Sequence, residues 1–100
     1  MFDEVSQQAE IWVWQGGGTQ GRWHFLTLSG DAVDALRMRA METRRGFGSV
    51  KVEATIGETS WRTSVFPQSG GKEFILPVKA SVRRAEGIGA GDSVTVRLSF

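Results

Sequence analysis

The sequence predicts a mostly β fold, a small closed or double-split β-barrel of about six strands with two short helices. Short segments in which apolar and polar residues alternate recur along the chain, and turns containing glycine separate them. The expected elements follow the order β-β-α-β twice, which indicates two half-barrels related by a pseudo-twofold axis. A chain of 100 residues that is 40% hydrophobic can also fill one core without a disulfide or a metal.

The expected strands are the segments with a two-residue period. They lie at residues 9–14, 22–28, 50–56, 59–66, 73–76 and 94–100. The polar residues 1–8 are expected to be frayed, so that residues 9–100 form a single β-barrel domain. The turn at 15–21 is rich in glycine, Gly57 supplies the positive φ of a tight hairpin, and Pro67 is expected to end the second strand of that hairpin.

Two segments are expected to be helical. Ser29 has the hydroxyl of an N-cap for a helix over residues 30–43, and acidic residues lie near the positive end of its dipole. Pro77 is expected to open a second, shorter helix that ends near Gly87. Each helix would connect the two strands of its half to the last strand of that half.

Composition restricts the class of protein. There is no cysteine, which excludes disulfide scaffolds, thiolate nucleophiles and cysteine-based zinc sites, and the single histidine, His24, excludes a histidine-rich metal site. The first residues do not form a secretion signal and no apolar run is long enough to cross a membrane, so we expect a cytoplasmic protein without a membrane partner. The net charge of +1 is far below the excess typical of dedicated nucleic-acid binders.

The expected strand at 59–66 offers the first candidate contacts for a ligand. Alternation places Arg62 and Ser64 on one face and Trp61 on the other. An arginine beside a hydroxyl can hold a phosphate or a carboxylate, and the indole of Trp61 is a candidate apolar contact. The structural alternative is that Trp61 fills the barrel while Arg62 pairs with a cross-strand acid such as Glu53.

Lys79 and Arg83 are the second candidate, because helical spacing places both on one face of the second helix. Free backbone N–H groups at the start of that helix could join Lys79 in holding an anion, and the alternative is an ordinary solvated face. Trp12 and Trp14 share one face of the first strand. Exposed, they would stack on bases or grip a peptide; buried, they would cover one end of the barrel.

No motif in the sequence predicts catalysis or a cofactor. The glycine-rich turns lack the GK[ST] sequence and the following helix of a phosphate-binding loop. No GxSxG elbow places a serine beside His24, and the acidic residues form no convincing acid–base pair. We therefore expect no catalytic residue, no metal and no cofactor, and we favour a protein that is not an enzyme.

Almost the whole chain also resembles a known family. The runs IWVW, RWHFLTLS, GFGSVKVEATIGETSWRTSVFP and LPVKASVRRAEGIGAGDSVTV are similar to the bacterial and archaeal family called domain of unknown function 1905 (DUF1905). The resemblance implies a fold like that of double-split β-barrels and no demonstrated activity. The segment 76–98 is in addition similar to the looping hairpin of AbrB- and MazE-type swapped-hairpin barrels.

Three functions remain as hypotheses. The first is a non-enzymatic binding module for a protein, a peptide or a small anionic ligand. Its expected contacts are Arg62, Ser64, Lys79, Arg83, Trp12, Trp14 and Trp61. The second is nucleic-acid binding by analogy with AbrB-like barrels, which we do not favour because the net charge is small and Asp31 and Asp34 occupy the first helix. The third is an enzyme acting on a small molecule. Because both halves lie in one chain, we expect a monomer.

Overall fold

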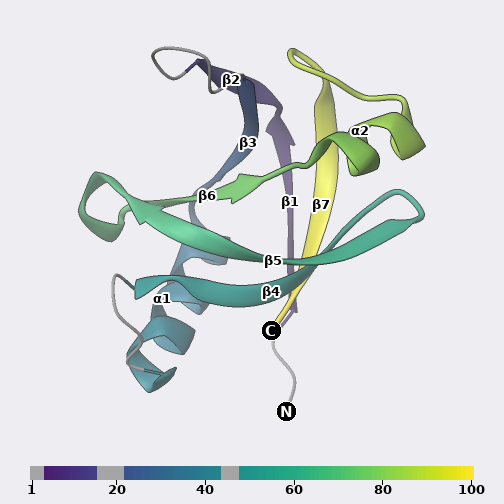
Figure 1. Ribbon diagram of the computed structural model, residues 1–100. Helices are drawn as coiled ribbons and strands as arrows, with labels where there is room; N and C mark the ends of the chain where they lie inside the picture. Colours follow the sequence, from purple (N-terminus) through teal and green to yellow (C-terminus); the bar gives the residue numbers. More distant parts are fainter. Residues whose placement is uncertain (1–3, 16–21, 44–47) are drawn as a thin grey trace.

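The computed structural model of the chain describes residues 4–15, 22–43 and 48–100. Over these residues seven strands form one curled antiparallel sheet in the order β1-β7-β4-β5-β6-β3-β2, with α1 and α2 at opposite ends of the molecule (Figure 1). The strands are β1 (Glu4–Glu10), β2 (Trp12–Gln15), β3 (Arg22–Leu28), β4 (Val50–Ile56), β5 (Thr59–Gln68), β6 (Glu73–Pro77) and β7 (Ser93–Ser99). The helical elements are α1 (Asp31–Thr43), the short 3₁₀ turn η2 (Ser69–Gly71) and α2 (Ala80–Glu86).

The sheet is a curled half-barrel of seven strands. The predicted mostly β class with two helices is confirmed, and the closed form of the predicted barrel of about six strands is wrong. β1 pairs with β7 and β2 pairs with β3, but the described residues contain no backbone pairing between β1 and β3. The Gln7 side chain bridges these two strands instead. Its Nε2 donates to the Thr27 carbonyl at 3.2 Å, and the Ser29 N–H donates to its Oε1 at 3.0 Å.

The strand expected at 9–14 is interrupted at Ile11. Its first residues belong to β1 and those after Ile11 belong to β2, so the described strands number seven. Ile11 is buried there, its N–H donates to the Asp92 carbonyl at 2.9 Å, and the Gly91 N–H donates to the Ile11 carbonyl at 2.8 Å. β1 pairs with β7 and β2 pairs with β3. In the same way, the first part of the single long strand β5 pairs with β4 and its last part pairs with β6. The strand pairings of the two halves therefore correspond.

The polar segment at the start of the chain departs from the prediction. Residues 4–8 were expected to be frayed, whereas they belong to β1 and pair with β7 in continuous register. Pairing uses backbone groups, which are the same for polar and apolar residues, so alternation alone does not reveal such a strand. Residues 1–3 and most of the turn predicted at 15–21 lie outside the described residues.

Both prolines belong to strands, contrary to the predictions made for them. Pro67 lies inside β5, just after β5 changes partner from β4 to β6. A residue without an N–H fits at such a position, because the ladder on one side has ended. Pro77 is the last residue of β6, and α2 begins only at Ala80, with Lys79 in extended conformation as its N-cap.

Helix α1 begins at Asp31, and its first turn is held by the Gly30 carbonyl, which accepts hydrogen bonds from the N–H groups of Val33 and Asp34. Ser29, the predicted cap, instead contributes its backbone N–H to the bridge with Gln7. α1 packs against β1 and β4, and α2 packs against β5. Among the described residues, no helix has the length and apolarity needed to cross a bilayer.

The core lies inside the curl of the sheet. Alternate residues of β4 and β7 are buried, as their periodicity predicted. Leu26 and Leu28 of β3 face the same interior, and Trp61 of β5 joins them at only 7% exposure. α1 contributes Leu36 and α2 contributes Val82, so each helix covers part of the interior that the strands leave open.

Candidate functional site

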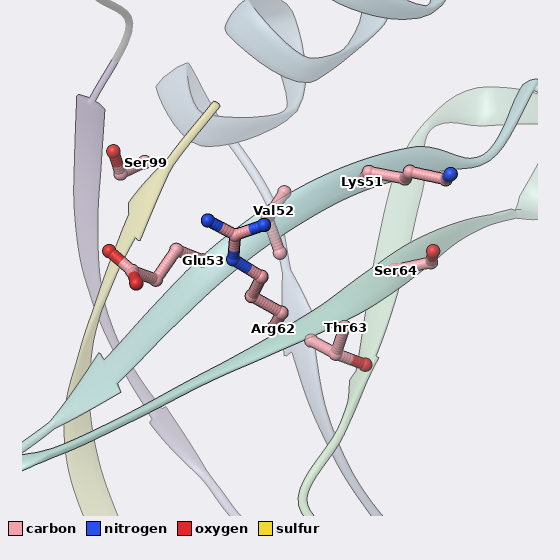
Figure 2. Close-up of a pocket in the computed structure, with 7 residues that line it drawn as sticks. All are labelled: Lys51, Val52, Glu53, Arg62, Thr63, Ser64 and Ser99. Atoms are coloured by element: carbon pink, nitrogen blue, oxygen red, sulfur yellow. The ribbon is translucent and has the colours of Figure 1, made fainter.

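Two hollows among the described residues contain predicted ligand contacts. The β4–β5 groove, on the outer face of the sheet, has a volume of about 630 Å³ and is lined by Lys51, Val52, Glu53, Arg62, Thr63, Ser64 and Ser99 (Figure 2). The cationic pocket, where β3, β6 and α2 meet, has a volume of about 350 Å³ and is lined by Arg22, Trp23, His24, Pro77, Val78, Lys79, Ala80 and Arg83. The structure therefore separates Arg62 and Ser64 from Lys79 and Arg83.

The β4–β5 groove is open and carries charges of both signs. Arg62 is the cross-strand partner of Glu53, and Lys51 is the partner of Ser64. Figure 2 shows the Arg62 guanidinium and the Glu53 carboxylate turned toward the same side of the two strands. A carboxylate in this position lowers the attraction of the groove for an anion, because its charge opposes that of the neighbouring cations. The groove therefore has the character of the solvated outer face of an antiparallel sheet.

The cationic pocket is assembled by the pairing of β3 with β6. The ladder runs to Phe25 opposite Pro77, and the Val78 N–H then extends it by donating to the His24 carbonyl at 2.9 Å. This bond holds the segment that follows β6 alongside the beginning of β3. As a result Lys79, which precedes α2, lines the same hollow as Arg22, which opens β3.

Arg83 completes the positive charge of the cationic pocket. Its side chain is half-buried, and its Nε donates to the Val78 carbonyl at 3.2 Å. This bond fixes the guanidinium while its terminal N–H groups remain able to donate to a ligand. Arg22 and Lys79 are exposed, and no carboxylate is among the described residues that line the hollow. Three cations therefore share one small space, and none of its described lining residues is acidic.

The positive charges of the cationic pocket affect the pKa of His24. Burial lowers the pKa of its imidazole below the ordinary value of 6.5, and the positive charges of Arg83 and Arg22 lower it further. Its Nδ1 is buried, and none of the described residues forms a hydrogen bond with it. The imidazole is therefore neutral near pH 7. The charge of the pocket comes from its arginines and its lysine.

The four tryptophans have three different environments. Trp61 fills the core, and Trp12 is half-buried, with its indole N–H donating to the Thr27 hydroxyl at 2.8 Å. Trp14 and Trp23 are cross-strand partners and are 51% and 52% exposed. Of the two tryptophans predicted on the first strand, Trp12 is thus part of the packing and Trp14 is available at the surface.

Arg22 and Trp23 are the site residues that sequence reasoning missed. Both lie in the run RWHF, which the sequence marks only as a strand. The signal that identifies them is the register of β3 against β6, which brings them beside Lys79 and is not contained in the periodicity of either strand. Within the described residues, no three His, Cys, Asp or Glu side chains gather closely enough to hold a metal ion.

Comparison with protein-family models identifies one family. A search of curated proteins found no match. The model of the family described as domain of unknown function (DUF1905) matches residues 8–98, which is most of the chain. The match includes every residue that lines the two hollows except Ser99. The chain therefore belongs to the DUF1905 family.

Proposed function

We propose that the protein is a non-enzymatic binding module that holds a small anionic ligand in the cationic pocket. One observation carries the proposal: Arg22 comes from β3, Lys79 and Arg83 come from the segment of α2, and all three line one hollow in which the described residues supply no carboxylate. Like charges brought together in this way repel one another, and a bound anion relieves the repulsion.

The chemistry of the pocket suits a phosphate or a carboxylate. Arginine presents a planar set of donors that matches the oxygens of either group, and lysine adds a mobile point charge. The bond from Arg83 to the Val78 carbonyl orients one guanidinium before any ligand arrives. The volume of about 350 Å³ lies at the lower end of the range for small-molecule sites. The ligand we propose is accordingly small.

The lining of the pocket favours binding over a reaction. Acyl or phosphoryl transfer requires a nucleophile or an acid–base pair placed beside the reacting atom. The described residues that line the pocket offer one imidazole, two guanidinium groups and one lysine, without a hydroxyl, thiol or carboxylate among them. The β4–β5 groove is the weaker site for an anion, because Glu53 lies within it beside Arg62.

Inorganic phosphate is the probe that tests the proposal. Arg22→Gln/Lys79→Gln removes two positive charges from exposed side chains, and Lys51→Gln/Arg62→Gln removes two from the β4–β5 groove as the matched control. A hydrogen bond to a charged group contributes about 1.5 kcal/mol or more, so each lost cation is expected to weaken phosphate binding about tenfold. The control variant is expected to bind phosphate as the unmodified protein does.

The imidazole resonances of His24 provide the readout, because His24 is the single histidine of the chain. A phosphate bound beside it would oppose the fields of Arg83 and Arg22, so saturating phosphate is expected to raise the pKa of His24. An unchanged His24 pKa, or weakening by the groove variant instead of the pocket variant, would contradict the proposal. Urea unfolding of each variant verifies that lost binding is not lost folding.

A further inference from the structure

The exposed indoles of Trp14 and Trp23 belong to an aromatic face on the β2–β3 hairpin. The register pairs Trp14 with Trp23 and Trp12 with Phe25, which places the four rings on one side of the two strands. Phe25 supports this face: it stacks against Trp23 with ring centroids 6.3 Å apart and 12° between planes, and it lies 5.1 Å from Trp12. Trp23 is thus held in place by packing while half of its surface stays exposed.

This aromatic face adjoins the cationic pocket, and Trp23 belongs to both. Large aromatic residues are usually buried, and side-by-side exposed indoles leave a broad apolar surface in water. Tryptophan also presents a flat π face on which another ring can stack. Alternation turns Trp23 and Arg22 to opposite faces of β3, so the surface suited to a flat ring meets the pocket suited to an anion at Trp23, which belongs to both.

We propose that the small anionic ligand is a mononucleotide, whose phosphate occupies the cationic pocket and whose base stacks on Trp14 and Trp23. This inference rests on the function proposed above and specifies its ligand. A nucleotide joins an anionic group to a flat aromatic ring through a short sugar, which is the combination that the two adjoining surfaces offer. Indole–base stacking accepts any base, so the structure specifies a nucleoside phosphate without specifying which base it carries.

The charge distribution favours one nucleotide over a nucleic-acid strand. A strand requires cations spaced along its whole path, whereas the chain carries a net charge of only +1 and its pocket cations gather at one point. The aromatic face likewise has its exposed part confined to the cross-strand pair of Trp14 and Trp23. The site therefore matches one phosphate and one base.

The test compares AMP with ribose 5-phosphate, which has the same sugar and phosphate but no base. By calorimetry AMP is expected to bind at least about fivefold more tightly, the lower limit for stacking of one base on an aromatic side chain. Trp14→Ala is expected to remove most of this advantage while leaving the affinity for ribose 5-phosphate unchanged. Phe66→Ala, which removes another exposed aromatic side chain at 42% exposure, is the matched control and is expected to keep the advantage.

Trp14 is the better residue to change because Trp23 stacks on Phe25, so that Trp23→Ala also removes packing. Equal affinities for AMP and ribose 5-phosphate would overturn the nucleotide inference and leave the anion-binding function standing. Binding of neither compound would overturn both. Tighter binding of a single-stranded oligonucleotide, with a log–log salt slope that requires several phosphate contacts, would overturn the mononucleotide in favour of a strand.

Discussion

The Gln7 bridge can be tested by replacing Gln7 with alanine. Its side-chain amide is what joins β1 to β3, where the described residues have no backbone ladder. Gln8, the next residue, points to the other face of β1, and its Nε2 makes one exposed hydrogen bond to the Ser93 hydroxyl. Gln8→Ala therefore removes the same chemical group from the same strand without breaking the bridge.

The expected loss of stability follows from the two hydrogen bonds of Gln7. The bond to the Thr27 carbonyl is partly buried and contributes about 1 kcal/mol, whereas the bond from the exposed Ser29 N–H contributes about 0.5 kcal/mol because water can replace it. Gln7→Ala should therefore lower the free energy of unfolding by about 1.5 kcal/mol. For a domain of this size that corresponds to a fall in Tm of about 6–12 °C.

Urea unfolding followed by tryptophan fluorescence measures this difference. Gln8→Ala is expected to cost about 0.5 kcal/mol or less, because its bond is exposed. Gln7→Glu keeps the acceptor for Ser29 but turns a carboxylate oxygen toward the Thr27 carbonyl, so it should destabilise at least as much as Gln7→Ala. Equal stability of the Gln7→Ala and Gln8→Ala variants would refute the view that Gln7 holds the half-barrel together.

Two further predictions concern a turn and the histidine. Gly57 has a φ of +58°, and a Cβ at this position would collide with the Glu86 carboxylate, which accepts hydrogen bonds from the Glu58 N–H and the Thr59 hydroxyl. Gly57→Ala should therefore lower the free energy of unfolding, measured in urea, by about 2 kcal/mol. The loss should exceed that of Gly70→Ala, because Gly70 has a similar φ of +68° but open space around it. The pKa of His24 is lowered in the folded protein, so the unfolded chain binds this proton first and the free energy of unfolding should fall as the pH drops through 6.5. His24→Gln should reduce this loss of stability at low pH. If the variant loses stability with falling pH as the unmodified protein does, the prediction is wrong.

The strands with one buried face were predictable from sequence, because burial imposes alternation. Val50, Val52 and Ala54 are buried as their period indicated, and the same rule located β7. β1 could not be found in this way, since its stability comes from backbone pairing with β7 and from Gln7. The positions of Pro67 and Pro77 also depend on which strand lies alongside, and a local rule for proline does not contain that information.

The candidate site was predictable only in part. Lys79 and Arg83 were predicted together from helical spacing; in the structure Lys79 is the extended residue that precedes α2, and both residues line one hollow. Arg62 and Ser64 share a face of β5 as predicted, but the fold places them in a separate groove beside Glu53. Arg22 joins the pocket through the long-range register of β3 with β6, which depends on the packing of the whole sheet.

The pairing of β1 with β7 has a consequence for how the chain folds. Gln8 and Ser93 are 85 positions apart, so β1 leaves the ribosome long before the strand that satisfies its backbone. Contacts between such distant residues form slowly, because closing a long loop costs entropy before any bond is gained. A strand that remains unpaired until its partner is synthesised is exposed to other nascent chains, and an apolar strand would associate with them. The glutamate and glutamine side chains of β1 are polar, so we expect this strand to have little tendency to associate with other chains before β7 is made.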